Sequence, residues 1–267
     1  MTRCAPHSEQ HQTAIPQGFS EWYGLVDPTT YQYYDYKLSE NGTIRQYGHA
    51  PGDYQTDVLA RRAVEVIGRT VPHEAPLFLT LAPLAPHTQV RNGIGENPIP
   101  APRHSSAFPN AHPDKALPYN EADVSDKPSW IRGLPSFTPA VEDTITQRYR
   151  AVLRSLLAVD EAVGQMVAAL KATGELDRTM FVFTSDNGLF FGEHRITYGK
   201  RIPYEAALRV PLMIRAPGLG AERGAVSHTL VTNADLPATL MDVAGADPAR
   251  PLDGRSLLPL LKNPAEV

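Results

Sequence analysis

The chain has 267 residues, of which 42% are hydrophobic, and it carries a formal net charge of -4 at pH 7. This length and apolar content allow one large α/β domain or two small ones and exclude a disordered chain. The mild negative charge gives no electrostatic basis for binding nucleic acid or an anionic membrane. No apolar run approaches the ~20 residues of a membrane span, and the first residues lack the apolar core of a signal peptide. We therefore expect a soluble chain, while its compartment and oligomeric state stay open.

The first part of the chain predicts a hairpin followed by a helix. The stretch YQYYDYKLSENGTIRQYG contains two β-like pieces around Asn41-Gly42, a dipeptide typical of tight hairpin turns. Thr56 is the expected N-cap of a helix whose apolar positions include Leu59 and Ala63.

An apolar run, LFLTL at residues 77–81, predicts a buried strand that leads into a proline-rich segment. Eleven of the 25 prolines fall within residues 83–139, which excludes long regular elements there. The segment keeps aromatic and aliphatic side chains, so we expect an ordered surface excursion rather than a disordered loop.

The second half of the chain alternates helix and strand. Its strands are apolar throughout instead of alternating apolar with polar residues. Together with the strand at residues 77–81, this pattern predicts an α/β fold with a mostly parallel central sheet that helices cover on both faces. The expected elements are a helix over residues 144–172, strands over 180–183 and 210–214, and a last helix over 235–243.

Polar side chains follow two of these strands at the point where each strand ends. Residues 180–183 lead into the turn SDNG, which contains Asp186 and Asn187, and residues 77–81 lead to His87. Functional groups of parallel sheets gather beyond the carboxyl ends of the strands. Asp186 and Asn187 offer hard oxygen donors suited to Ca²⁺ or Mg²⁺. Asp, Asn and Gly are also common turn residues, so plain turn chemistry is the alternative.

Three further side chains could serve the same site. Lys200 could clamp a tetrahedral oxyanion beside a divalent cation, or it could be an ordinary solvated lysine. His87 could bind or protonate a leaving group, or its ring could cap a carbonyl of its own turn. His194 could line the opening of the same site or stabilise its own loop, and we favour the second role.

Separated motifs of the chain include LFLTLAPLAPH, FVFTSDNGLFFGEHR, GKRIPYEAALRVPLMIRAPG and LDGRSLLPLL. In this order they resemble the sulfatase family of the alkaline-phosphatase-like superfamily. The resemblance covers about residues 18–261 and leans towards glucosamine-6-sulfatase-like and arylsulfatase members. It implies the alkaline-phosphatase-like sulfatase fold, with residues 1–267 forming a partial catalytic domain that is incomplete at both ends.

The resemblance also implies roles for individual residues. Asp186 and Asn187 would be ligands of a divalent cation, usually calcium in this family. Lys200 would contact the sulfate, and His87 would contact the ester oxygens or assist the leaving group. His194 is a weaker candidate for contact with the substrate, which would be a small-molecule or glycan sulfate ester.

The nucleophile of the family has no match in the sequence. Sulfatases use a formylglycine made from the cysteine of a Cys-X-Pro-Ser-Arg motif, and its hydrate attacks sulfur. The only cysteine, Cys4, lies in CAPHS, where His7 and Ser8 occupy the Ser and Arg positions, and we interpret the partial match as coincidence. We therefore expect a truncated chain that is inactive by itself and holds its cation weakly.

Two other functions stay open at this point. A phosphate or phosphonate ester hydrolase of the same superfamily would need a serine, threonine or cysteine nucleophile and usually zinc or manganese. A non-catalytic protein that binds sulfated glycans would need no nucleophile, although basic residues do not cluster into a stripe suited to glycans.

Overall fold

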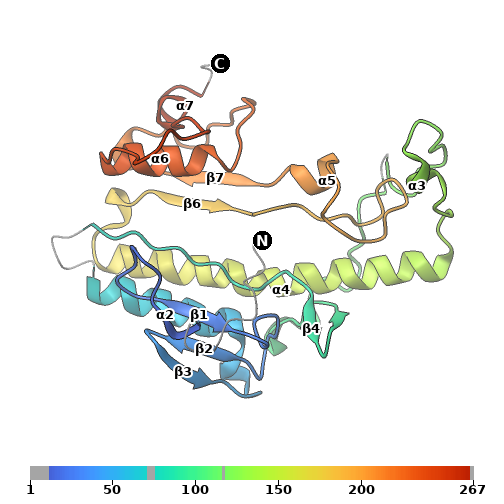
Figure 1. Cartoon of the computed structure of the whole chain (residues 1–267), viewed down its shortest axis with the longest axis horizontal. Coiled ribbons are helices and arrows are strands. Elements are labelled where there is room, and N and C mark those ends of the chain that lie inside the picture. The colour runs from blue at the N-terminus through green and yellow to red at the C-terminus, as the bar shows by residue number, and fades with distance from the viewer. Residues whose placement is uncertain (1–11, 71–75, 116–117, 265–267) are drawn as a thin grey trace. The chain divides into compact units, whose positions relative to one another are not determined.

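The computed structural model describes residues 12–70, 76–115 and 118–264, so that Cys4 lies outside the described residues. The chain divides into two compact units (Figure 1). Unit 1 comprises Met1–Thr173 and the loop Phe191–Tyr198, and unit 2 comprises Gly174–Phe190 and Gly199–Val267. None of the helices in the described part of the chain combines the length and apolar character that crossing a membrane requires.

Unit 1 begins with a three-stranded antiparallel meander. Its strands are β1 (Tyr23–Val26), β2 (Lys37–Glu40) and β3 (Thr43–Gln46). The turn between β2 and β3 lies at Asn41 and Gly42, whose φ angles are 51° and 91°. Two successive residues with positive φ are what a two-residue hairpin turn requires, so the predicted hairpin is confirmed.

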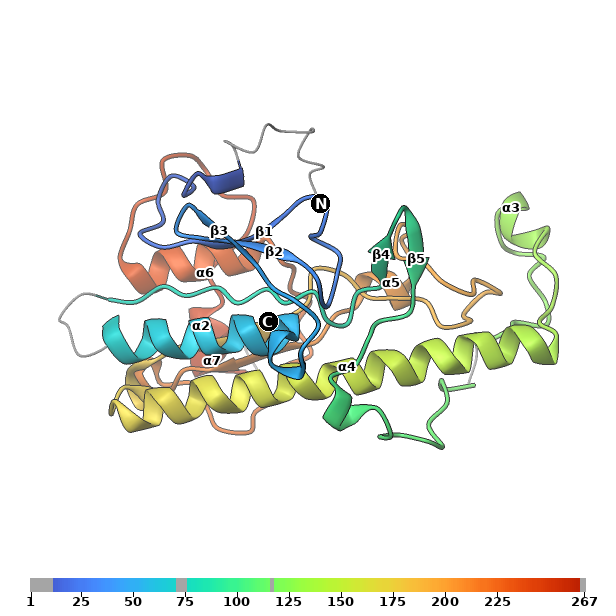
Figure 2. The same ribbon diagram turned by 90° about the horizontal axis from the view of Figure 1, so that it is seen from below.

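Two long helices of unit 1 were predicted. The helix α2 (Gln55–Thr70) packs along the C-terminal half of α4 (Pro139–Ala172), as Figure 2 shows. The hydroxyl of Thr138 accepts a hydrogen bond from the N–H of Val141, and this N-cap starts α4 ahead of the predicted first residue. The expected N-cap of α2 was wrong, because the helix begins before Thr56 and contains it.

A tyrosine-rich core joins the meander to the helices. The rings of Tyr36 and Tyr47 stack with their centroids 5.1 Å apart, and those of Tyr33 and Tyr54 stack at 5.7 Å. Removing such large apolar surfaces from water is the main stabilising term for a unit of this kind. Two clusters of buried residues form this core. One contains Tyr36, Leu38, Tyr47, Val58 and Leu59, and the other contains Tyr33, Tyr34, Tyr54, Ala85, Ala101 and Ala158.

Residues 77–81 were predicted as a buried strand, and the structure contradicts this prediction. The segment forms no strand, and Phe78 is 64% exposed. An apolar run becomes a buried strand only where neighbouring strands take up its backbone groups. None of the strands in the described part of the chain pairs with these residues.

Within the proline-rich range 83–139, the described residues 83–115 and 118–138 form short elements only, and α4 begins at Pro139. Arg103 fixes part of it to the helices, because its guanidinium pairs with Asp57 of α2 and Glu161 of α4. The elements are β4 (Gln89–Arg91), β5 (Ile94–Glu96), the 3-10 turn η2 (Pro102–His104) and α3 (Ser129–Arg132).

Unit 2 contains the two later predicted strands and the last predicted helix. The strand β6 (Phe181–Thr184) pairs with β7 (Leu212–Arg215), and α6 (Asp235–Ala244) ends at Gly245, whose φ is 60°. The short helices are α5 (Glu205–Leu208) and α7 (Leu258–Lys262), and 3-10 turns lie at η3 (Leu176–Arg178) and η4 (Pro217–Leu219).

The predicted mostly parallel central sheet is not confirmed. Every strand ladder within the described residues is antiparallel, including β6 with β7. An apolar strand indicates burial on both faces, but its side chains do not encode the direction of its neighbour.

Asp235→Ala is expected to lower the free energy of unfolding by about 2 kcal/mol, because it removes two charge-assisted hydrogen bonds that the buried Asp235 carboxylate accepts from backbone N–H groups. The Asp235 carboxylate accepts from the N–H groups of Arg255 (2.9 Å) and Thr232 (2.7 Å), and these bonds lower its pKa. Because the folded-state pKa is depressed, this stability is present above pH ~4 and is lost as the pH falls through the folded-state value. Urea unfolding at pH 7 and at lower pH measures both effects. The exposed Asp247→Ala is the control, and equal midpoints for the two variants would contradict the expectation.

Candidate functional site

The candidate metal ligands directly follow β6 in unit 2. Asp186 is exposed, and its carboxylate has no hydrogen-bond partner among the residues that the structure describes. The Asn187 amide nitrogen donates to the carbonyl of Gly188 (3.0 Å), which leaves the Asn187 Oδ1 as an acceptor without a donor in the described ranges. Two neighbouring side chains therefore present oxygen atoms that the fold does not use.

The SDNG turn is held from two sides within unit 2. The amide nitrogen of Asn233 donates to the carbonyl of Ser185 (3.3 Å), and the N–H of Gly188 donates to the carbonyl of Ala207 (2.8 Å). A Cβ at Gly188 would lie 2.1 Å from the Ala206 carbonyl oxygen, so only glycine permits this approach to α5. Sequence analysis missed Asn233, because nothing in the sequence links it to a turn 47 residues earlier.

Lys200 lies in the same unit, between the SDNG turn and α5. Its side chain is half-buried and forms no ion pair with the residues described. The N–H of Phe190 donates to the carbonyl of Gly199 (3.0 Å), which ties the backbone beside Lys200 to the segment that follows the turn. An ammonium group that is partly withdrawn from water and lacks a counter-ion is suited to bind an anion.

The donor types at the SDNG turn fit a hard divalent cation. Ca²⁺ takes six to eight oxygen ligands, and Asp186 and Asn187 supply one carboxylate and one amide oxygen. No cluster of three or more His, Cys, Asp and Glu side chains that could hold a metal occurs in the described part of the chain. The two residues therefore fit the chemistry of calcium and provide a small part of its ligand set.

His87 belongs to unit 1, and its ring is oriented by its own loop. Its Nδ1 lies 2.8 Å from the carbonyl oxygen of Thr88. A carbonyl only accepts, so Nδ1 carries the proton and Nε2 is left to face a ligand. The hydroxyl of Tyr33 donates to the His87 carbonyl (2.7 Å), and the ring of Tyr31 packs against the imidazole at 5.1 Å. The ring thus caps a carbonyl through one nitrogen and keeps the other available.

His194 also belongs to unit 1, where it fastens its loop. Its Nδ1 lies 2.7 Å from a carboxylate oxygen of Glu121, and its backbone N–H donates to the carbonyl of Pro118 (2.9 Å). The hydrogen bond from His194, supported by Lys127, lowers the pKa of the Glu121 carboxyl. These contacts favour the loop-stabilising interpretation of His194 over contact with the substrate.

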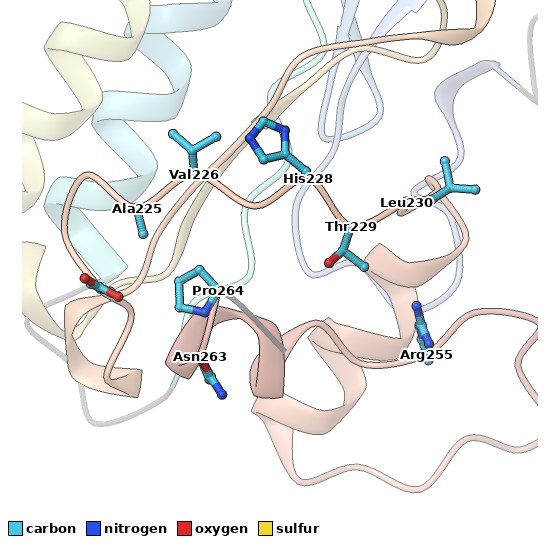
Figure 3. Close-up of a pocket in the computed structure, with 9 residues that line it drawn as sticks. Ala225, Val226, His228, Thr229, Leu230, Arg255, Asn263 and Pro264 are labelled. Atoms are coloured by element: carbon cyan, nitrogen blue, oxygen red, sulfur yellow. The ribbon is translucent and has the colours of Figure 1, made fainter. Parts of the chain in front are cut away.

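A surface hollow of about 830 Å³ lies elsewhere in unit 2 (Figure 3). Val226, His228 and Arg255 line it, and none of the predicted site residues is among its lining residues. Val226 is 74% exposed, so the hollow is an open surface feature rather than an enclosed site.

Comparison with known proteins identifies the family of the chain. The family model described as Sulfatase matches residues 5–246. An arylsulfatase of Volvox carteri is 36% identical over 255 residues, which are 90% of this chain and 39% of the relative. An N-acetylglucosamine-6-sulfatase of Homo sapiens is 34% identical over 258 residues, with 95% of this chain and 44% of the relative covered. The chain therefore spans less than half of the length of these relatives.

Solved structures share the fold. One, in complex with its substrate D-glucosamine-2-N,6-O-disulfate, has a TM-score of 0.70 and 25% identity, covering 95% of this chain and 60% of that one. A phosphonate monoester hydrolase from Silicibacter pomeroyi has a TM-score of 0.60 and 25% identity, covering 90% and 48%. These neighbours have the alkaline-phosphatase-like fold, which is the fold that the motifs around the SDNG turn predict. The chain belongs to the sulfatase family.

Proposed function

We propose that the protein hydrolyses sulfate esters of sugars and that this chain contributes residues that bind the sulfate group. The observation that carries the proposal is Lys200, half-buried and without a counter-ion in the described ranges, in the stretch that follows the free oxygens of Asp186 and Asn187. The relatives named arylsulfatase and N-acetylglucosamine-6-sulfatase support a sulfate ester as the substrate class.

Each residue has a separate role in this proposal. Asp186 and Asn187 would hold a divalent cation, proposed to be Ca²⁺, which would offset the negative charge of the sulfate oxygens when bound. Lys200 donates hydrogen bonds to a sulfate oxygen. His87 would assist the departing alcohol through Nε2, the nitrogen that the contact with the Thr88 carbonyl leaves available.

These residues account for binding the ester and assisting the leaving group, and they include no nucleophile. The formylglycine of the family has no counterpart in these 267 residues, in which Cys4 is the only cysteine. We therefore propose that this chain by itself binds the ester. Hydrolysis of the ester is the activity of the sulfatase family as a whole.

Binding of D-glucosamine 6-sulfate to the purified chain, followed by ligand-observed NMR in the presence of calcium, tests this assignment. Lys200→Ala is expected to weaken binding about tenfold, since a charge-assisted hydrogen bond contributes about 1.5–3 kcal/mol. The exposed Lys171→Ala, at the end of α4, is the matched control and should bind like the unmodified chain. Equal affinity for unsulfated D-glucosamine would contradict the proposed substrate class.

The likeness to a phosphonate monoester hydrolase favours a second candidate, hydrolysis of phosphate or phosphonate esters. The same residues would then bind a phosphoryl group in place of a sulfate. D-glucosamine 6-phosphate, titrated in parallel, separates the two candidates: clearly tighter binding of the phosphate than of the sulfate would favour the second.

A further inference from the structure

The loop that carries His87 is held by hydrogen bonds from the interior of unit 1. The hydroxyl of Tyr33 donates to the carbonyl of His87 (2.7 Å), and the N–H of Val90 donates to the carbonyl of Tyr31 (2.9 Å). Within the loop, the N–H of His87 donates to the carbonyl of Leu84 (2.7 Å). The backbone that follows His87 is therefore tied to the segment that contains Tyr31 and Tyr33.

Two buried glutamines hold the ends of this loop. Gln55, the first residue of α2, is 0% exposed. Its amide nitrogen donates to the carbonyl of Gln32 (2.9 Å), and its Oε1 accepts from the N–H of Leu84 (3.1 Å). Gln89, the first residue of β4, is 2% exposed, and its Oε1 accepts from the N–H of Tyr33 (3.3 Å). Each end of the loop is thus bonded to the interior through a side-chain amide.

Tyr33 joins the two glutamines into one network. Its N–H donates to Gln89, its carbonyl accepts from the N–H of Gln55 (3.0 Å), and its hydroxyl donates to the carbonyl of His87. We call Tyr33, Gln55 and Gln89 the tyrosine–glutamine frame. Buried polar groups are unfavourable unless they are bonded, and a bonded network favours one arrangement of the segments that it joins.

The frame acts on the imidazole through the peptide group that follows His87. Rotation of the His87–Thr88 peptide would carry the Thr88 carbonyl away from Nδ1 of His87, which lies 2.8 Å from it. The hydroxyl of Tyr33 opposes this rotation, because it is bonded to the carbonyl oxygen of the same peptide group. With one proton held on Nδ1, a second proton can be taken up or given away only at Nε2.

We infer that Tyr33, Gln55 and Gln89 are positioning residues that fix the Nδ1–H tautomer of His87 and so present Nε2 to the departing alcohol. The inference deepens the proposed function and rests on it. Gln55 and Gln89 are the two buried side-chain amides of the residues that the structure describes, and both belong to this one network. Apolar side chains would fill the same space without needing hydrogen-bond partners, so the two amides indicate that the exact position of the loop matters.

Tyr33→Phe tests the inference, because it removes the hydroxyl and keeps the buried ring. Long-range ¹H–¹⁵N spectra of the ¹⁵N-labelled chain at about pH 8.5, where neutral imidazoles predominate, report which ring nitrogen carries the proton. Loss of signals in His87→Gln identifies those of His87. The unmodified chain is expected to show the Nδ1–H tautomer. In Tyr33→Phe the tautomer ratio should move about fivefold towards Nε2–H, the factor that one neutral hydrogen bond is worth.

Tyr36→Phe is the matched control for Tyr33→Phe. Tyr36 is equally buried, and its hydroxyl has no hydrogen-bond partner in the part of the chain that the structure describes. Gln55→Met removes the bonds to Gln32 and Leu84 and should move the tautomer ratio in the same direction as Tyr33→Phe. If Gln55→Met does not fold, Tyr33→Phe still decides. A tautomer ratio in Tyr33→Phe that equals the ratio in Tyr36→Phe overturns the inference, even where Tyr33→Phe is less stable.

Titration of D-glucosamine 6-sulfate into the same labelled chains separates the inference from the proposed function. A sugar that binds and moves the Nε2 resonance of His87, and moves it less in Tyr33→Phe, supports both. A sugar that binds without moving this resonance overturns the inference, while sulfate binding through Lys200 stands. If the sugar does not bind, the proposed function fails, and the tautomer ratios alone decide whether the frame fixes His87.

Discussion

Gly188→Ala is expected to lower the free energy of unfolding by about 3 kcal/mol and to displace the SDNG turn. The new Cβ would lie 2.1 Å from the carbonyl oxygen of Ala206. That oxygen belongs to the backbone of α5, so it cannot move aside as the end of a flexible side chain could. Relief of the clash would also break the hydrogen bond from the Gly188 N–H to the carbonyl of Ala207 (2.8 Å). Asp186 and Asn187 would lose their position along with the turn.

Urea unfolding measures the loss for Gly188→Ala, and Gly164→Ala is its matched control. Gly164 lies within α4, and a Cβ there meets no atom within 4 Å. Alanine is the better helix former, so the control should stabilise the chain by about 0.5–1 kcal/mol. Unchanged stability of Gly188→Ala would show that α5 does not fix the turn.

Arg195→Met is expected to lower the free energy of unfolding by about 3 kcal/mol and to release the loop Phe191–Tyr198 from unit 1. The Arg195 guanidinium donates to the carbonyl oxygens of Glu121 (2.9 Å), Ala122 (2.8 Å) and Leu134 (2.9 Å). Methionine keeps a similar apolar length but leaves all three acceptors without a donor.

Backbone strain in the loop adds to the expected effect of Arg195→Met. His194 and Arg195 have φ angles of 53° and 62°, a left-handed conformation that non-glycine residues adopt at a cost of about 1–3 kcal/mol each. The three hydrogen bonds of Arg195 offset part of that cost. Hydrogen exchange of the amides of residues 191–198 should therefore rise in Arg195→Met. It should stay near its original level in the control Arg61→Met, because Arg61 is exposed on α2 and donates to the carbonyl of Gly52. Unchanged exchange in Arg195→Met would contradict the role of the guanidinium.

The parts of the fold that sequence predicts are those that depend on local patterns. The hairpin at Asn41-Gly42 and the helix α4 follow from residues that are close together in the chain. The strand expected at residues 77–81 fails because burial depends on strands supplied from elsewhere. The predicted parallel pairing is not confirmed for the same reason. The apolar pattern of β6 does not specify whether its neighbour runs parallel or antiparallel.

The same distinction between local and long-range patterns applies to the residues of the candidate site. Asp186 follows a predicted strand, and both Asp186 and Lys200 lie in motifs that resemble the family. Short stretches of sequence around each residue are therefore enough to predict a role for it. Asn233 is missed, because its contacts with the SDNG turn join residues 47 and 48 positions apart. Such contacts become visible only when the folded chain brings the segments together.

The assignment of Asp186 and Asn187 as cation ligands is tested most directly by titrating Ca²⁺ into the ¹⁵N-labelled chain. We expect saturable shifts of the amide resonances of residues 185–188, with a dissociation constant of about 1 mM because the chain supplies few oxygen ligands. Asp186→Asn should abolish these shifts without unfolding the chain, since the Asp186 carboxylate makes no hydrogen bond with the described residues. Identical shifts in the unmodified chain and in Asp186→Asn would contradict the assignment.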